Sequence, residues 1–273
     1  MTKNLSRAAE RSKPSFIALL TDFGLGDPYL GTVKAVILSI HPHARFIDVS
    51  HQVAPQQVHQ AGYLLWSSYK FFPIGTLFVC IVDPGVGTER KVIAVKTQKY
   101  MFLAPDNGLL SFVLTGEKIL EMRELDLARS KKFHLDVVSS TFHGRDIFAP
   151  VAAYLSKGMK MSALGPKIKA PLWPNPFVMG KSDATRPVIL HIDHFGNIIT
   201  NIRAEQQKAL EIKTVAIGNS LVSRWVRYYE ETPDRTPALI AGSSGLIEII
   251  VKRDNAAKLL GVTIGTPISI YWA

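Results

Sequence analysis

The sequence contains one cysteine, Cys80, and few of the features that mark a secreted or membrane protein. A single cysteine cannot form an internal disulfide, so we expect a reducing compartment, the cytoplasm. Cys80 lies in an apolar segment, where a thiol more often fills a core than acts as a nucleophile. No apolar run reaches the ~18 residues of a membrane helix. The first 15 residues are polar and basic, which predicts a flexible tail rather than a secretory signal.

Several catalytic signatures are also missing. No G-x-G-x-x-G opens a helix, and no Gly-Lys-Ser/Thr follows a glycine-rich loop, so neither a dinucleotide fingerprint nor a Walker loop is present. The G-x-S-x-G turn of serine hydrolases is absent. No set of histidine, cysteine and carboxylate residues has the spacing of metal ligands, so we expect no metal.

The charge balance is basic, with a net charge of +10. Such a charge raises the possibility of nucleic-acid binding. The basic residues are scattered, however, apart from residues 129–132 and 157–169, and neither cluster alternates with aromatic residues that would stack on bases. We therefore expect no nucleic-acid partner and interpret the charge as an aid to solubility.

The first part of the chain alternates short apolar runs with segments whose apolar residues recur at helical spacing. This order predicts a Rossmann-like α/β domain with a mostly parallel sheet and right-handed crossovers. Asp27 and Asp146 precede two of the helical segments and are expected to cap them. The predicted strands cover residues 16–20, 45–49, 76–82, 92–96 and 100–104, and the predicted helices cover 29–40, 56–69, a short segment from 109, and 147–157.

Residues 166–176 contain four prolines, and the pattern changes beyond them. Short β-like runs then follow one another, with at most one or two helical turns at 205–210, which predicts a small antiparallel β-barrel. The expected division is a tail (1–15), an α/β domain (16–165), a proline-rich linker (166–182) and a β-barrel domain (183–273). The predicted strands of the second domain cover residues 188–192, 198–202, 214–217, 238–241, 246–251 and 267–272.

The clearest candidate site follows the buried strand that ends near Asp83. A Pro-Gly-Val-Gly-Thr turn comes next, and Arg90 closes the loop. Ligands of open α/β sheets bind beyond the carboxyl ends of the strands, where this carboxylate and guanidinium are expected. A surface ion pair in a turn is the alternative interpretation.

Other polar groups follow predicted strands or lie in turns. Asp22 follows the first strand and fits either a helix cap or a ligand of a ribose diol, whose two hydroxyls suit two carboxylate oxygens. His143 lies in a polar turn and fits either a solvated loop histidine or a functional group. Asp106, Asn107 and the Phe195-Gly196-Asn197 turn are further candidates.

Six motifs occur in order along the chain: Thr21-Asp22-Phe23-Gly24, Phe72-Pro73-x-Gly75-Thr76, Val82-Asp83-Pro84-Gly85-Val86-Gly87-Thr88-x-Arg90, Ala104-Pro105-Asp106-Asn107-Gly108, Thr141-Phe142-His143-Gly144-Arg145-Asp146 and Phe195-Gly196-Asn197-x-x-Thr200-Asn201. From about Phe16 to the C-terminus the chain resembles the S-adenosyl-L-methionine hydroxide adenosyltransferases, relatives of the fluorinases and chlorinases. The resemblance implies hydrolysis of S-adenosyl-L-methionine, as a substrate rather than a cofactor, to adenosine and L-methionine. It also implies an α/β domain followed by a β-barrel, and a homotrimer with sites between subunits.

The resemblance further implies roles for individual residues. The catalytic triad of the family falls on Asp83, Arg90 and His143, which we expect to fix and activate one water molecule. The halogenating relatives carry an aromatic residue where Asp83 stands, and the fluorinase has a serine where Gly144 stands, so the chain resembles the water-using branch. The substrate contacts implied are Asp22, Asp27, Phe142, Gly144, Phe195, Asn197, Ser243, Glu248 and Val251.

Two other functions remain open at this point. One is halide attack, by chloride or fluoride, on the same substrate. The other is a module that binds adenosine or S-adenosyl-L-methionine without significant turnover. The sequence also does not decide which member of the triad removes the proton from water.

Overall fold

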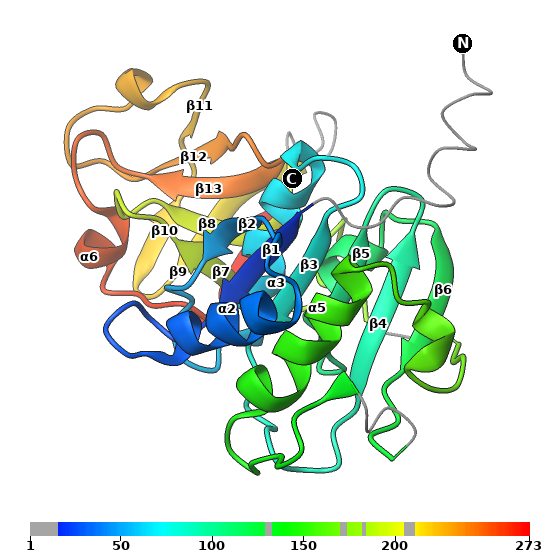
Figure 1. Ribbon diagram of the computed structural model, residues 1–273. Helices are drawn as coiled ribbons and strands as arrows, with labels where there is room; N and C mark the ends of the chain where they lie inside the picture. Colours follow the sequence, from blue (N-terminus) through cyan, green and yellow to red (C-terminus); the bar gives the residue numbers. More distant parts are fainter. Residues whose placement is uncertain (1–15, 129–132, 170–173, 182–183, 205–210) are drawn as a thin grey trace. The chain divides into compact units, whose positions relative to one another are not determined.

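The computed structural model describes residues 16–128, 133–169, 174–181, 184–204 and 211–273 (Figure 1). The chain divides into two compact units, Met1–Trp173 and Pro174–Ala273. The predicted tail of residues 1–15 and the predicted helical turns at 205–210 lie outside the described residues. The predicted linker, residues 166–182, contains the division between the units.

Unit 1 contains a six-stranded sheet in the order β2-β1-β3-β5-β4-β6. In this order, neighbouring strands from β2 to β5 pair in parallel. Strand β4 pairs antiparallel with both β5 and β6. The predicted parallel pairing is therefore confirmed, the predicted strands 92–96 and 100–104 are β4 and β5, and β6 was not predicted. The strands are β1 (Ile17–Thr21), β2 (Phe46–Ser50), β3 (Leu77–Ile81), β4 (Val92–Thr97), β5 (Met101–Pro105) and β6 (Ile119–Glu124).

Helices cover both faces of this sheet. The predicted helix over residues 29–40 is α2, which packs with α5 on one face, while α3 and α4 pack together over the other. Alternate residues of β1 therefore enter different cores, Leu19 on the α2 side and Leu20 on the α3 side. Strands buried on both faces read as continuous apolar runs, which explains the uninterrupted apolar composition of β1 and β3. The helices are α2 (Tyr29–Ile40), α3 (Val58–Ser68), η1 (Tyr69–Phe71), α4 (Ser111–Leu114), the π-helix η3 (Gly144–Phe148), α5 (Ala149–Ser156) and η4 (Met161–Ala163).

Cys80 is fully buried within β3, as expected of a core residue. Burial in apolar surroundings raises the pKa of its thiol. A raised thiol pKa disfavours the nucleophilic thiolate, so Cys80 contributes packing rather than chemistry.

The two helix caps predicted in unit 1 are wrong. The N-cap of α2 is Pro28, with no side-chain cap bond, and Asp27 is exposed one residue earlier. Asp146 lies inside η3, because helical structure begins already at Gly144. The carboxylate of Asp146 instead accepts from the backbone N–H of Ser139, at 2.8 Å, and so fastens the preceding loop.

Unit 2 consists mainly of two sheets, in the orders β11-β12-β13-β8-β7 and β10-β9-β14. Pairing is antiparallel, as predicted, apart from the short parallel pair β11–β12. An isolated bridge between Val188 and Pro267 links the edges of the two sheets. The elements are β7 (Ile189–Ile192), β8 (Ile198–Arg203), β9 (Ile212–Ile217), β10 (Ser220–Val222), β11 (Trp225–Val226), η6 (Tyr229–Glu231), β12 (Ala238–Ala241), β13 (Leu246–Ile250), α6 (Ala256–Leu260) and β14 (Ile268–Trp272).

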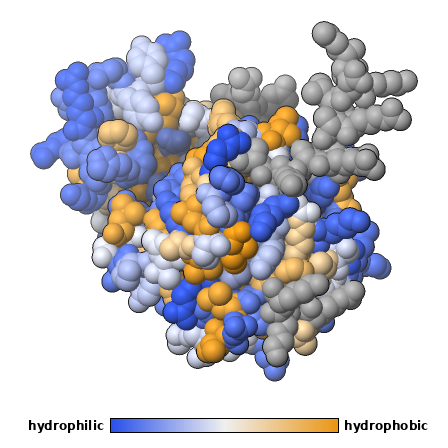
Figure 2. All heavy atoms as spheres, viewed as in Figure 1, coloured by the Kyte–Doolittle hydropathy of each residue, from blue (hydrophilic) through white to orange (hydrophobic). Residues whose placement is uncertain are grey.

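On the face seen in Figure 2, hydrophobic residues lie interspersed among hydrophilic ones. Among the described residues, every helix is too short or too polar to traverse a lipid bilayer.

Candidate active site

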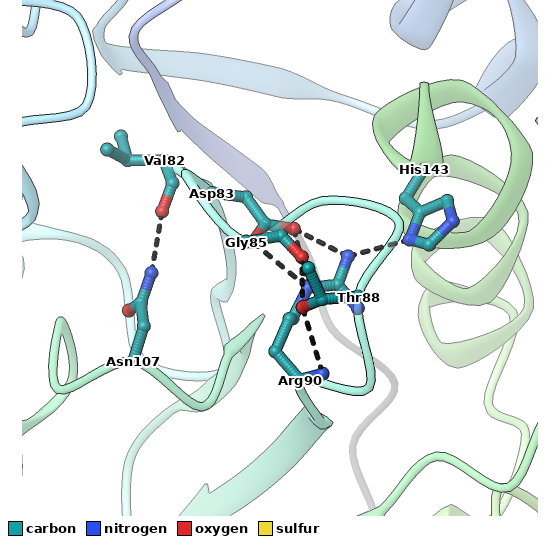
Figure 3. Close-up of polar contacts among 7 residues, drawn as sticks. All are labelled: Val82, Asp83, Gly85, Thr88, Arg90, Asn107 and His143. Carbon is teal, nitrogen blue, oxygen red and sulfur yellow. Dashed lines mark hydrogen bonds and ion pairs between the residues drawn. The ribbon is translucent and has the colours of Figure 1, made fainter. Parts of the chain in front are cut away.

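The loop after β3 has a defined shape. The side-chain amide of Asn107 donates to the carbonyl of Val82, at 2.9 Å, and fixes the point where the chain leaves the sheet (Figure 3). Gly87 has a φ of +79°, and a Cβ there would lie 2.3 Å from the carbonyl oxygen of Ser140. Only glycine fits both the left-handed conformation and this close approach. The loop therefore packs directly against the segment that carries His143.

Arg90 turns back toward the start of the same loop. The hydroxyl of Thr88 donates to the carbonyl of Gly85 at 2.7 Å and accepts from the backbone N–H of Arg90 at 3.3 Å, which closes the turn. The Nε of Arg90 donates to Oδ1 and Oδ2 of Asp83, at 3.0 and 2.7 Å, and its Nη2 also pairs with Oδ2. The side chains of Arg90 and Asp83 are only 12% and 6% exposed. This is a largely buried, multiply bonded ion pair, whose two charges compensate each other.

The same guanidinium reaches His143. The Nη2 of Arg90 lies 2.7 Å from Nδ1 of His143, which comes from the residue just before η3 (Figure 3). Because a guanidinium only donates hydrogen bonds, Nδ1 accepts, and the proton of the neutral imidazole is on Nε2. Burial and the charge of Arg90 lower the pKa of His143, against the opposite effect of Asp83 and Asp146. His143 is therefore neutral at pH 7 and presents an N–H donor at Nε2.

A cavity of about 290 Å³, here called the front cavity, lies beside this group and is lined by Asp22, Asp83, Phe142, His143 and Gly144, among others. Oδ2 of Asp22 accepts a hydrogen bond from the backbone N–H of Gln56, at 2.9 Å. Gln56 has a positive φ of 66°. Within the described part of the chain, nothing donates to the other oxygen of Asp22, which is suited to a hydroxyl donor.

The front cavity has one aromatic side. The ring of Phe142 packs edge-on against Phe23 and Tyr29, at centroid distances of 5.9 and 5.2 Å. A Cβ on Gly144 would come within 3.1 Å of the Phe23 ring, so the absence of a side chain lets this ring approach. The predicted contact Asp27 is exposed and does not line the cavity.

The carboxylate of Asp146 fastens the loop that carries His143. Its side chain is fully buried and accepts from Nε of Arg145 at 2.6 Å, in addition to the backbone of Ser139. Burial would raise the pKa of Asp146, but the hydrogen bonds from Arg145 and Ser139 outweigh it and hold that pKa below its ordinary value. The sequence motif contains Asp146, but its role as an anchor for residues 139–146 could not be inferred from it.

Unit 2 has its own cavity, of about 710 Å³, lined by Phe195, Asn197 and Val251 among the predicted contacts. Asn197 is fixed there by a 2.9 Å bond from its Nδ2 to Asp193. Phe195 is 76% exposed, and its ring packs edge-on against His194 at a centroid distance of 5.7 Å.

Two predicted contacts of unit 2 do not line this cavity, Ser243 and Glu248. Burial and the nearby Asp193 raise the pKa of Glu248, which is hydrogen-bonded to Tyr229. Asp193 and Tyr229 do line the cavity and were not predicted. Asp193 directly follows an apolar run, the signal that selected Asp22 and Asp83, whereas Tyr229 carries no such signal.

These features define a class: an α/β protein with a cavity beyond the carboxyl ends of parallel strands and a buried carboxylate–guanidinium–imidazole group beside that cavity. Residues 17–165 match the SAM hydroxide adenosyltransferase N-terminal domain, and residues 188–269 match the C-terminal domain of the same family. The chain belongs to the SAM hydroxide adenosyltransferase family.

Similarity to individual proteins supports this family assignment. The chain is 33% identical over 259 residues to the (R)-S-adenosyl-L-methionine hydrolase of Thermus thermophilus, covering 93% of this chain and 98% of that protein. It is 27% identical to the fluorinase of an Actinoplanes species, over 71% of this chain and 74% of the fluorinase. A crystal structure of an uncharacterized conserved protein from Thermotoga maritima superposes with a TM-score of 0.80 at 33% identity, covering 94% of this chain and all of that one.

Proposed function

We propose that this protein hydrolyses S-adenosyl-L-methionine to adenosine and L-methionine. The observation that carries the proposal is the hydrogen-bonded group Asp83–Arg90–His143, two of whose members line the front cavity. The similarity to (R)-S-adenosyl-L-methionine hydrolases over nearly the whole chain supports the choice of substrate.

In the proposed mechanism, a water oxygen attacks the 5′ carbon in line with the departing sulfur. The C5′–O bond forms as the C5′–S bond breaks, the bonding pair leaves on sulfur as the neutral thioether of methionine, and the water loses one proton. As the water loses its proton, its oxygen becomes hydroxide-like, and this negative charge cancels with the positive charge of the sulfonium when the C5′–O bond forms. A dry cavity favours this step because opposite charges approach and cancel.

The three side chains have distinct proposed roles. His143 donates its Nε2–H to the attacking oxygen and orients it, because its Nδ1 is occupied by Arg90. Asp83 keeps lone pairs on its carboxylate and takes the proton of the water. Arg90 holds the other two in place and stabilises the negative charge. Asp22 binds the ribose hydroxyls, with Phe142 and Gly144 shaping the cavity beside it.

Product analysis in heavy-oxygen water tests this function. After incubation with S-adenosyl-L-methionine, mass spectrometry should find the label in the 5′ hydroxyl of adenosine and none in methionine. Label elsewhere, or no adenosine at all, contradicts the proposal. Repeating the incubation in chloride and fluoride, with a search for 5′-halo-adenosine, tests halide attack. Tight adenosine binding without turnover would indicate a binding module instead.

We also propose a cytoplasmic homotrimer, as the family resemblance implies. The buried cysteine suits a reducing compartment. Sedimentation equilibrium should give three times the chain mass of 30.2 kDa, and a monomer mass at micromolar concentration would contradict the trimer.

A further inference from the structure

A second cavity lies against the proposed triad. This back cavity has a volume of about 350 Å³ and is lined by the loop from Thr88 to Val92, by residues 124–128, and by His143 and Ile147. Arg90 lines the back cavity but not the front one, and Asp83 lines the front cavity but not the back one. Among the residues that the structure describes, His143 alone lines both cavities. The ion pair and the imidazole therefore contribute to the linings of both cavities, Asp83 to the front one, Arg90 to the back one and His143 to each.

The lining of the back cavity suits water. Its rim carries the charged groups Glu89, Lys91, Glu124 and Asp126, and Lys91 is bonded to Glu124 at 2.8 Å on the surface. A cavity with this many polar partners is hydrated, whereas empty cavities are apolar. With Arg90 included, its lining has three carboxylates and two cations, so the excess negative charge opposes the entry of anions but not of neutral water.

The proposed reaction creates a need for such a space. Each turnover consumes one water molecule, and the nucleoside is expected to occupy the front cavity while the reaction proceeds. We propose that the back cavity is the path by which water reaches His143 while a nucleoside fills the front cavity. This inference rests on the proposed function, because it places the nucleoside beside Asp22 and His143.

The test measures the solvent access of His143 directly. Hydrogen–deuterium exchange at the C2 carbon of individual histidines, read by mass spectrometry of peptides, is recorded with and without saturating adenosine. Adenosine alone should leave the exchange of His143 nearly unchanged, because the back cavity stays open. His59, which does not line either cavity, serves as the internal control for changes that affect the whole unit.

A matched pair of substitutions at one position then closes or opens the path. Leu127 lines the back cavity and is 43% exposed, so Leu127→Trp should fill it and Leu127→Ala should widen it with little effect on the core. With adenosine bound, exchange at His143 should slow by about tenfold or more in Leu127→Trp and not in Leu127→Ala. Ala128→Trp is a second variant that should fill the back cavity. With two such variants, the result does not depend on whether one tryptophan side chain points into the cavity.

Two outcomes overturn the proposal. One is strong protection of His143 by adenosine in the unchanged protein, and the other is equal exchange in the filled and widened variants with adenosine bound. Calorimetry with adenosine separates these from failure of the proposed function. No adenosine binding defeats the proposed function, whereas binding together with protected His143 defeats only the water path.

Discussion

At the scale of single residues, the site depends on a charge pair that is useful only because it is buried. The side chains of Asp83 and Arg90 are almost inaccessible, so water screens their interaction weakly. Removing either partner leaves an unpaired charge beside His143 and removes one proposed catalytic group. The effect on turnover should therefore be much larger than for a surface ion pair.

We expect Asp83→Ala, Arg90→Ala and His143→Ala each to lower the turnover of S-adenosyl-L-methionine by about 100-fold or more, with a modest loss of adenosine affinity. Adenosine release measured by chromatography and binding measured by calorimetry check the two parts. Arg227→Ala is the matched control, because it breaks an Arg–Glu pair whose arginine is 85% exposed. Near wild-type release by all three variants would refute the assignment.

The protonation state of His143 leads to a second prediction. If the imidazole orients water through Nε2–H, glutamine, which also has an N–H donor but cannot act as a base, should partly replace it. His143→Gln is expected to retain about tenfold more turnover than His143→Ala, the value of one hydrogen bond. Turnover of His143→Gln no higher than that of the alanine variant would indicate that His143 is the base.

The pH dependence follows from the same residue. Protonation of His143 requires a proton on Nδ1, which the guanidinium of Arg90 opposes, so its pKa is lowered by burial and by Arg90. Since an unfolded histidine titrates near its ordinary pKa, the contribution of His143 to stability is complete above that value. It is lost as the pH falls toward the lowered pKa of the folded state. Turnover in the unchanged protein should also fall at acidic pH, as His143 becomes protonated. This fall should be absent from the pH profile of turnover in His143→Gln.

The motifs in the sequence singled out these three residues as candidates but did not predict how they are arranged. Asp83 and Arg90 are seven positions apart in one loop, and their pairing could be anticipated from the turn between them. His143 lies 53 positions from Arg90, so only the fold shows that Nδ1 faces the guanidinium. The back cavity depends on distances between three separate segments and has no signature in the sequence.

At the scale of elements, the apolar pattern predicted the buried strands and α2 but failed at the helix ends. A helix of 12 residues carries several repeats of its apolar face, whereas a cap is decided by one residue and its backbone angles. Because the π-helix η3 begins at Gly144, Asp146 lies inside a helical segment rather than at a cap position. Its carboxylate there fixes the loop that carries His143. The alternation in β6 is incomplete, with one buried residue among six, and gave no clear strand signal.

Asp146→Ala should therefore destabilise unit 1 by about 3 kcal/mol, because a buried carboxylate is lost while its donors remain. Chemical denaturation of the variant and the unchanged protein measures this difference. The pKa of Asp146 is lowered in the fold, so its stabilisation is complete above the ordinary aspartate pKa and is lost as the pH falls through the lowered value. The difference between the two proteins should shrink in that acidic range, and a difference independent of pH would contradict the assigned role.

At the scale of the whole molecule, each core described is built from residues of one unit only. Two cores flank the sheet of unit 1, one on each face, and a third fills unit 2 around residues of β8, β9 and β13. Proteins built from units with separate cores commonly unfold in more than one step. A substitution that leaves a cavity in one core should then lower the stability of that unit without an equal loss of stability in the other unit.

Ile249→Ala is suited to this test, because Ile249 is fully buried in the core of unit 2 and does not line either the front or the back cavity. The substitution should cost about 3 kcal/mol, the transfer free energy of the deleted groups plus the cavity they leave. Backbone hydrogen exchange should accelerate in peptides from β8 and β13, while peptides from β1 and β3 keep their protection. Leu103→Ala, at a fully buried position in unit 1, is the reciprocal variant and should give the reverse pattern. Equal acceleration in both units would mean that they unfold as one body, and destabilising either unit would then disturb the Asp83–Arg90–His143 group as well.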